Sequence, residues 1–252
     1  MANGEKKTAI NDDIVLTQRV NGLTFGTDAY LLSAFVKGSS NAVQVDLGSG
    51  TGIIPLLCAT RKKAKKIYAA EIQKKFVSII DRNAKENGFS DVITAIEADV
   101  RELRASDVGC EADIVTANPP YMKVDSGKRN EHDEKFIARH EVFGGISDFC
   151  ACAYRLLKHG GKFYTVWRPD RLCDLICSLR ENKLEPKRII FVCATDKNDP
   201  SMVLVQSTKG AAPGSVVTRP LILHQSREDA AKAILSPDAK EIYDTCSFES
   251  FK

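Results

Sequence analysis

One short stretch constrains the fold of this chain more than any other. Residues 45–52 (VDLGSGTG) contain the end of an apolar run with an acid in it, followed by three alternating glycines. Residues 53–60 follow with the apolar content of a buried helix, and Pro55 is tolerated in its first turn because an N–H there has no helical partner. A strand, a glycine turn and a helix in this order are typical of the first unit of a parallel α/β sheet.

The rest of the chain continues this alternation of strand-length apolar runs and stretches of helical period. We expect strands at residues 42–47, 66–70, 92–97, 113–117, 162–167, 188–195 and 202–208, with helices at 53–60, 72–84, 147–158 and 170–182. The last two strands are joined by a polar turn that is too short for a parallel crossover, so 202–208 should run antiparallel. The expected fold is a doubly wound, Rossmann-like α/β sheet of seven mainly parallel strands, with helices on both faces.

Length and composition favour one domain and exclude several classes of protein. The chain has 252 residues and 43% hydrophobic content, enough for one large core. We divide it into an N-terminal segment (1–40), a catalytic core (41–208) and a C-terminal extension (209–252) whose role the sequence does not indicate. No apolar stretch suits a signal peptide or a membrane span, and the eight cysteines show no metal-binding spacing. We therefore expect a cytoplasmic monomer without a metal or a membrane partner.

The glycine turn predicts a particular cofactor. In dinucleotide-binding proteins a further glycine falls where this chain has Ile53, and an acid before the glycines would repel a pyrophosphate. Such an acid can instead accept a hydrogen bond from the α-ammonium group of S-adenosylmethionine, which becomes S-adenosylhomocysteine. We expect contacts with the cofactor at the ends of the first four core strands. The residues are Asp46, Gly48, Ser49, Gly50, Gly52, Glu71, Asp99 and Asn118.

Two of these acids have specific expected roles and simpler alternatives. Glu71 ends the second strand, where a carboxylate can accept hydrogen bonds from both ribose hydroxyls. Asp99 follows the third strand and is placed to accept from the adenine amine of the cofactor. Alternatively, Glu71 is a solvated acid at the start of a helix and Asp99 an ordinary turn aspartate.

A second motif, Asn118-Pro119-Pro120-Tyr121, follows the fourth strand of the core and predicts catalysis at a nitrogen. The prolines stiffen the backbone and remove two donors, so that the Asn118 side chain and the Pro119 carbonyl remain as acceptors. Two acceptors on the hydrogens of a conjugated NH2 group favour its pyramidal form, whose lone pair can attack a methyl group. Tyr121 offers a flat surface for stacking. Adenine N6, cytosine N4 and a glutamine amide all present such a group.

Four segments together narrow this choice: residues 25–32 (FGTDAYLL), 46–52, 118–121 and 137–141 (IARHE). In this order they resemble the bacterial family of class I methyltransferases that methylate N6 of the adenine beside the anticodon of tRNA(Val). The resemblance covers nearly the whole chain and implies S-adenosylmethionine as methyl donor and tRNA as substrate. It also implies that Phe25, Thr27 and Asp28 close over the cofactor, although Thr27 or Asp28 could simply cap the helix that follows.

The long charged segment after the proline motif is a candidate RNA contact. Its expected substrate-binding residues are Lys123, Lys128, Arg129, Arg139 and His140, and the basic run 61–66 is a further candidate for phosphate contacts. The alternative for each group is an ordinary solvated charge run. His140 is expected to contact substrate or support structure, since the amine chemistry needs no strong base.

Two other functions are compatible with the same motifs. One is methylation of a glutamine amide in a protein of release-factor type, although such enzymes usually carry a helical N-terminal domain before the first core strand. The other is a binding module without catalysis, which would not need the acceptors of the proline motif. A further alternative, close to the leading hypothesis, is methylation of a different base amine in RNA.

Overall fold

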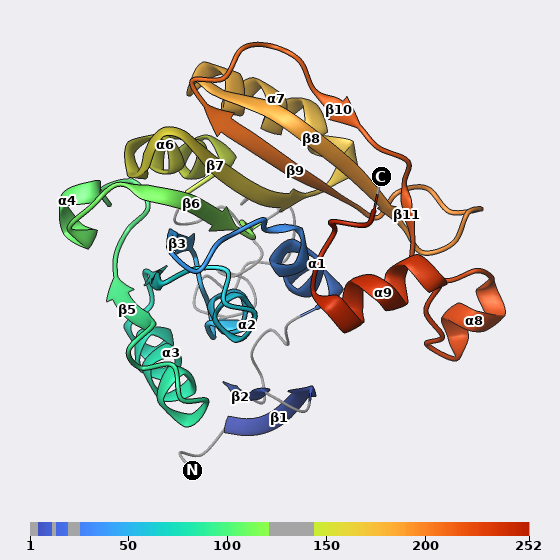
Figure 1. The fold of residues 1–252 in the computed structure, drawn as a ribbon, viewed down its shortest axis with the longest axis horizontal. Coiled ribbons are helices and arrows are strands. Elements are labelled where there is room, and N and C mark those ends of the chain that lie inside the picture. Colours follow the sequence, from blue (N-terminus) through green and yellow to red (C-terminus); the bar gives the residue numbers. More distant parts are fainter. Residues whose placement is uncertain (1–4, 12–13, 20–25, 121–143, 252) are drawn as a thin grey trace, which may run out of the picture.

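The fold is a large mixed β-sheet between two layers of helices (Figure 1). The computed structural model describes residues 5–11, 14–19, 26–120 and 144–251. The central strands are β3 (Val43–Leu47), β4 (Lys66–Glu71), β5 (Ile93–Glu97), β6 (Ala112–Ala117), β7 (Leu157–Trp167), β8 (Leu184–Cys193) and β9 (Met202–Lys209). They lie in the order β8-β9-β7-β6-β3-β4-β5. All neighbours pair in parallel except β9, which is antiparallel to both β7 and β8, as predicted from the short turn.

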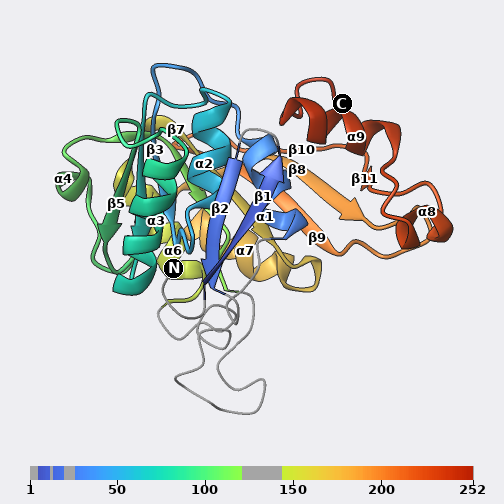
Figure 2. The same ribbon diagram turned by 90° about the horizontal axis from the view of Figure 1, so that it is seen from below.

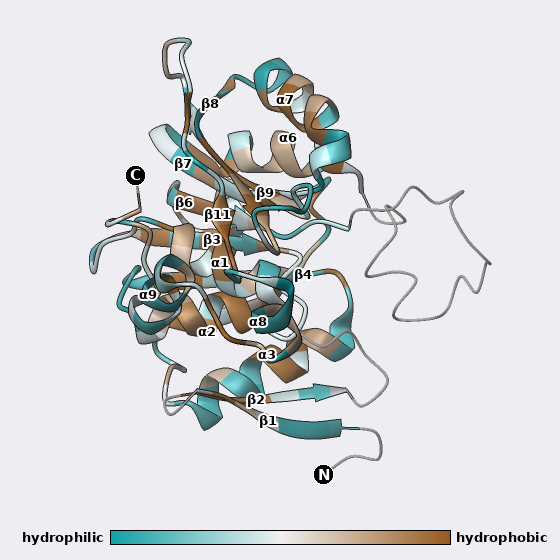
Figure 3. Cartoon of the chain, turned by 90° about the vertical axis from the view of Figure 1, so that its right-hand side faces the viewer, coloured by the Kyte–Doolittle hydropathy of each residue, from teal (hydrophilic) through white to brown (hydrophobic). Residues whose placement is uncertain are grey.

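Helices cover the two faces of this sheet and enclose two separate apolar cores. One face carries α1 (Thr27–Phe35), α2 (Ile53–Thr60), α3 (Lys74–Glu86) and α9 (Pro237–Thr245), and the other α4 (Ala105–Val108), α6 (Ile146–Leu156) and α7 (Leu172–Glu181). In Figure 3 hydrophobic residues occur along the central strands and on parts of the helices that cover them. A mainly parallel sheet with helices on both faces confirms the predicted Rossmann-like class. Because its strands are buried on both faces, they appear in the sequence as nearly continuous apolar runs.

The sheet is wider than the seven strands expected. Two short strands, β10 (Val216–Val217) and β11 (Leu221–Ile222), pair in parallel with β8 and make a sheet of nine strands. Each has only two residues, and Val216 and Val217 are exposed, so neither produces a recognisable apolar period. The C-terminal extension continues through α8 (Arg227–Ala231) and α9, which packs on α1.

An N-terminal hairpin is a further element that the sequence did not predict. Strands β1 (Glu5–Asn11) and β2 (Ile14–Arg19) are antiparallel, and β2 packs on α3 beside the main sheet (Figure 2). Buried Asn83 of α3 attaches the hairpin, because its amide accepts from Thr17 N at 2.8 Å and donates to Thr17 O at 3.1 Å. The same amide donates to Thr51 O at 2.9 Å, so the hairpin is linked to the glycine turn.

Candidate active site

The acid of the glycine turn lies inside the sheet rather than at its surface. Asp46, near the end of β3, has no exposed area, and its two carboxylate oxygens accept from the hydroxyls of Ser49 and Thr116, each at 2.6 Å. The amide of Gln44 donates to the Thr116 hydroxyl at 3.1 Å, which extends the network across β3 and β6. Burial raises the pKa of Asp46 to about 7, although both hydroxyl hydrogen bonds lower it.

The three glycines adopt left-handed backbone conformations that other residues rarely tolerate. Gly48, Gly50 and Gly52 have φ of 68°, 56° and 82°. A Cβ at Gly50 would meet no atom within 4 Å, so open space lies beside the backbone there. At Gly52 a Cβ would lie 3.3 Å from Ile80, and this glycine also serves as the N-cap of α2. The turn therefore presents open backbone for a ligand on one side and packs tightly against α3 on the other.

Glu71 closes this turn from the neighbouring strand. It is buried at the end of β4, and its carboxylate oxygens accept from Gly50 N and Gln73 N, each at 2.9 Å. Burial raises its pKa, while the backbone hydrogen bonds lower it. Glu71 is thus a buried acceptor that holds the glycine turn, and it is not a solvated acid at a helix start.

Asp99 lies beyond the end of β5 and forms an ion pair with a near neighbour. Arg101 donates to its carboxylate through the backbone N–H at 2.9 Å and through the guanidinium. The hydrogen bond from the Arg101 side chain lowers the pKa of Asp99. Contact between Asp99 and a cofactor adenine stays a prediction.

A hydrogen bond joins the proline motif to the N-terminal helix. Asn118 directly follows β6, and its amide nitrogen donates to Asp28 Oδ2 of α1 at 2.9 Å. Asp28 Oδ1 accepts from Ala29 N at 2.9 Å. The expectation that Thr27 or Asp28 caps α1 is wrong, because the N-cap is Gly26 and makes no side-chain cap. The Asp28 side chain turns toward Gly26, and its Oδ1 lies 2.7 Å from the position that a Cβ on Gly26 would occupy. Its carboxylate accepts hydrogen bonds from Ala29 and Asn118 instead of capping the helix.

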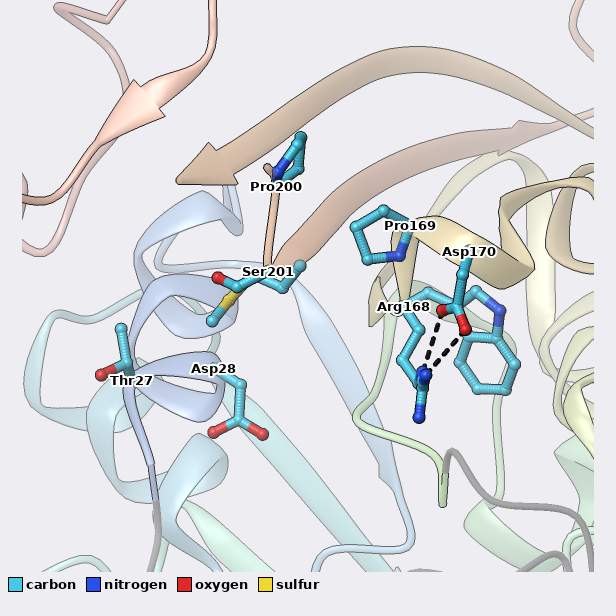
Figure 4. A pocket seen from close by; sticks show the side chains of 9 residues that line it. Thr27, Asp28, Arg168, Pro169, Asp170, Pro200 and Ser201 are labelled. Atoms are coloured by element: carbon cyan, nitrogen blue, oxygen red, sulfur yellow. Dashed lines mark hydrogen bonds and ion pairs between the residues drawn. The ribbon is translucent and has the colours of Figure 1, made fainter. Parts of the chain in front are cut away.

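A pocket of about 570 Å³ borders the same Asp28. It lies between the start of α1 and the turn after β7, and the residues that line it are Thr27, Asp28, Trp167, Arg168, Pro169, Asp170, Pro200, Ser201 and Met202. In Figure 4, Thr27 and Asp28 form one wall, Arg168 and Asp170 the opposite wall, and Pro200 and Ser201 lie between them. The pocket therefore opens at the carboxyl edge of the sheet, where α/β folds bind ligands.

Several predicted site residues lie outside the described part of the chain. They are Phe25, Tyr121, Lys123, Lys128, Arg129, Arg139 and His140. Pro119 and Pro120 are described, directly after Asn118. The basic run 61–66 leads into β4 at the opposite edge of the sheet, away from the pocket. There, mostly buried Lys63 donates to the carbonyls of Ser33, Ala34 and Val36 at the end of α1.

The sequence reasoning missed two groups of residues near the site. Gln44 and Thr116 support Asp46, and their only signal was a polar side chain within an otherwise apolar strand. Arg168 and Asp170 line the pocket, and their signal was a position directly after the strand predicted at 162–167. Within the described ranges, no cluster of three potential metal ligands occurs and no helix is long and apolar enough to cross a membrane.

Comparison with known proteins confirms the family resemblance. Residues 33–142 match the TRM5/TYW2 methyltransferase domain. A Porphyromonas gingivalis protein named tRNA1(Val) (adenine(37)-N6)-methyltransferase is 28% identical over 207 residues, covering 79% of this chain and 80% of that protein. Curated relatives at similar identity from other bacteria carry the same name.

Solved structures confirm the fold. The crystal structure of a predicted O-methyltransferase from Agrobacterium tumefaciens has a TM-score of 0.70 at 23% identity, covering 88% of this chain and 97% of that one. A tRNA m1G37 methyltransferase from M. jannaschii has a TM-score of 0.55 at 21% identity, covering 84% of this chain and 59% of the other. The chain therefore has the Rossmann-like class I methyltransferase fold.

Proposed function

We propose that this chain is an S-adenosylmethionine-dependent methyltransferase that acts on N6 of an adenine in tRNA, at the adenine beside the anticodon of tRNA(Val). The observation that carries this proposal is the hydrogen bond from Asn118 Nδ2 to Asp28 at 2.9 Å, at the strand end next to the glycine turn. A carboxylate only accepts, so the NH2 end of the amide must face Asp28. This orients the Asn118 amide and directs Oδ1 away from Asp28.

The residues around the glycine turn fit the proposed cofactor. Open space beside Gly50 gives a ligand access to the backbone, and Asp46, Glu71 and Asp99 provide carboxylates at the ends of the neighbouring strands β3, β4 and β5. Acidic side chains suit a molecule that carries an ammonium, a sulfonium and ribose hydroxyls. Gly48, Ser49 and Gly52 complete the turn. When bound, S-adenosylmethionine supplies an electrophilic methyl group there and leaves as S-adenosylhomocysteine.

The chain's own contribution to chemistry is to orient and polarise the acceptor amine. Asn118 Oδ1 and the Pro119 carbonyl accept the two amine hydrogens, so the nitrogen lone pair is withdrawn from conjugation and becomes available for attack. Pro120 keeps this backbone rigid, and Tyr121 stacks on the base. The nitrogen gains a methyl group and loses one proton to water, so no metal or strong base is required.

The choice of tRNA as substrate is supported by the names of the curated relatives and by the order of the four motifs. The segment after the proline motif supplies the proposed RNA contacts, which are Lys123, Lys128, Arg129, Arg139 and His140. Phe25, Thr27 and Asp28 would close the site from the side of α1. We further propose that the enzyme works in the cytoplasm as a single-domain monomer.

The test is transfer of labelled methyl from S-adenosylmethionine to unmodified tRNA(Val) transcripts, followed by nucleoside analysis. We expect N6-methyladenosine at the adenine beside the anticodon. Asn118→Ala should abolish transfer while S-adenosylmethionine still binds. A suitable control is Asn182→Ala, because Asn182 donates to Ser178 O at the far end of α7 and should leave transfer unchanged. Label that appears only on a protein of the extract would overturn the RNA proposal in favour of glutamine methylation.

A further inference from the structure

The pocket and the glycine turn lie on opposite sides of Asn118. The relevant strands are ordered β9-β7-β6-β3, with Asn118 directly after β6 and the glycine turn directly after β3. The pocket is formed at the end of β7 and the start of β9, where Trp167 pairs with Val203. A methyl donor at the glycine turn and an acceptor in the pocket would therefore approach Asn118 from two sides.

Arg168 is held in a fixed orientation at the outer wall of this pocket. Its Nε and Nη2 donate to the two carboxylate oxygens of Asp170, at 2.9 and 2.7 Å (Figure 4). Pro169 lies between the two residues and restricts the backbone of the turn. Both hydrogen bonds use one edge of the guanidinium, and Nη1 makes none with the residues that the structure describes. The side chain is 46% exposed, so the arginine is within reach of a ligand at the mouth of the pocket.

The lining of the pocket suits a nucleotide. Pro169, Pro200 and Met202 provide apolar surface of the kind that packs on a base, whereas Thr27, Asp28 and Ser201 provide hydrogen-bonding groups. The guanidinium of Arg168 lies across the pocket from Asp28, so a base directed toward Asp28 leaves its phosphate near the arginine. A guanidinium already fixed by a carboxylate loses less rotamer entropy when it binds a phosphate.

We propose that this pocket holds the target nucleotide of the RNA, and that Arg168, oriented by Asp170, binds a phosphate next to that nucleotide. The inference rests on the proposed function, because it takes RNA as the substrate. Asp170 acts as a positioning residue, and its charge does not prevent the contact because the exposed ion pair is screened by water.

Three variants test the role of Arg168, with tRNA(Val) transcripts as substrate. Arg168→Gln should raise KM for tRNA about tenfold, as expected for loss of a charged hydrogen bond, and should reduce the slope of log affinity against log salt by about 0.9. Arg168→Lys keeps the charge and should preserve the salt slope. The control is Arg180→Gln, because Arg180 is likewise an exposed arginine paired with a carboxylate, Glu185, but lies at the opposite edge of the sheet.

The outcomes separate this inference from the proposed function. Equal KM and salt slope for Arg168→Gln and Arg180→Gln would overturn the phosphate contact and leave tRNA methylation intact. A loss of S-adenosylmethionine affinity in Arg168→Gln that matches the loss for tRNA would also overturn it, since it would indicate a general disturbance of the site. Absence of methyl transfer to tRNA by the unaltered enzyme would overturn the proposed function, and the inference with it.

Discussion

Asp28 and Asn118 form the contact on which the proposed chemistry most depends. Asp28→Asn keeps the size of the side chain but replaces an obligatory acceptor with an amide that can also donate. The Asn118 amide then loses its single preferred orientation, and Oδ1 no longer faces the amine in every molecule. We expect kcat to fall by about tenfold or more, on the scale of a lost charged hydrogen bond.

The measurement is steady-state methyl transfer together with calorimetric titration of S-adenosylmethionine. Since Asp28 acts on the amine through Asn118, kcat should fall by a larger factor than cofactor affinity in Asp28→Asn. An unchanged kcat would show that the hydrogen bond between the two side chains does not orient the catalytic amide.

Asp46 makes the stability of the protein depend on pH. Its pKa of about 7 in the fold lies well above that of an aspartic acid in water, about 4, so between these two pH values the folded state binds a proton that the unfolded state has released. The stability contributed by this group is therefore complete below about pH 4 and is lost as the pH rises through 7. Asp46→Asn stays neutral throughout and lacks this dependence.

Urea unfolding of both proteins at several pH values between 4 and 8 isolates the contribution of Asp46. The free energy of unfolding of the unaltered protein, minus that of Asp46→Asn, should fall as pH rises and become constant above about pH 7. We expect the total change to be on the order of a few kcal/mol. A difference that does not vary with pH would mean that the buried carboxyl does not titrate in this range.

Residues close in sequence were predicted more successfully than partners distant in sequence. The turn at 46–52 was recognised because its acid and glycines are contiguous, and the structure places the glycines in the left-handed region as a tight turn requires. The link between Asp28 and Asn118 spans 90 positions and exists only once the sheet has formed. For the same reason the contacts of Asp46 with Thr116 and of Glu71 with Gly50 could not be read from the sequence.

At the scale of elements, α9 of the C-terminal extension supports the helix that carries Asp28. The rings of Tyr30 in α1 and Tyr243 in α9 stack at 4.4 Å with an interplanar angle of 4°, and the Tyr30 hydroxyl donates to Tyr243 O at 2.6 Å. Tyr243→Ala removes the stacked ring and should lower the free energy of unfolding by about 3 kcal/mol. It should also lower kcat, because the first turn of α1 loses a packing partner.

Tyr243→Phe is the matched control for this prediction. The hydrogen bond from Tyr30 ends on the backbone carbonyl of Tyr243, so phenylalanine retains both the stack and this bond and loses the side-chain hydrogen bond between the Tyr243 hydroxyl and Thr27. Thermal unfolding and methyl transfer should therefore be close to those of the unaltered protein. Equal losses in the two variants would assign the effect to the Tyr243 hydroxyl and contradict a role for the stacked ring.

The accuracy of the predicted elements follows the strength of their apolar patterns. Buried parallel strands such as β3 and β6 were located within a residue or two, because both of their faces are buried and most of their side chains are apolar. Strand β7 begins at Leu157, five residues before the predicted 162, because the chain is already extended through Gly160 and Gly161 where the helix predicted at 147–158 has ended. The N-terminal hairpin was missed because β1 is largely polar and is stabilised by packing of the hairpin on α3.

At the scale of the whole molecule, one apolar core connects the chain from its first strands to its last residues. The core on the α1 side includes Ile14 and Leu16 of the hairpin, the inner faces of α1 and α2, and Phe248 and Phe251 near the C-terminus. The second core lies on the opposite face of the same strands. Because both cores share one sheet, we expect the protein to unfold as a single domain in one calorimetric transition, with equal calorimetric and van't Hoff enthalpies.

Truncation after residue 209 tests whether the C-terminal extension belongs to this cooperative unit. The extension buries Leu221, Ala239, Ile242, Phe248 and Phe251 almost completely, so its removal exposes the facing surface of α1 and the edge of β8. Burying one large apolar side chain stabilises a fold by about 1.5 to 3 kcal/mol, and several such losses approach the whole stability of a typical domain. We expect the truncated chain to show no cooperative melting transition. A truncated chain that melts cooperatively at an unchanged temperature would instead make the extension an independent appendage to residues 41–208.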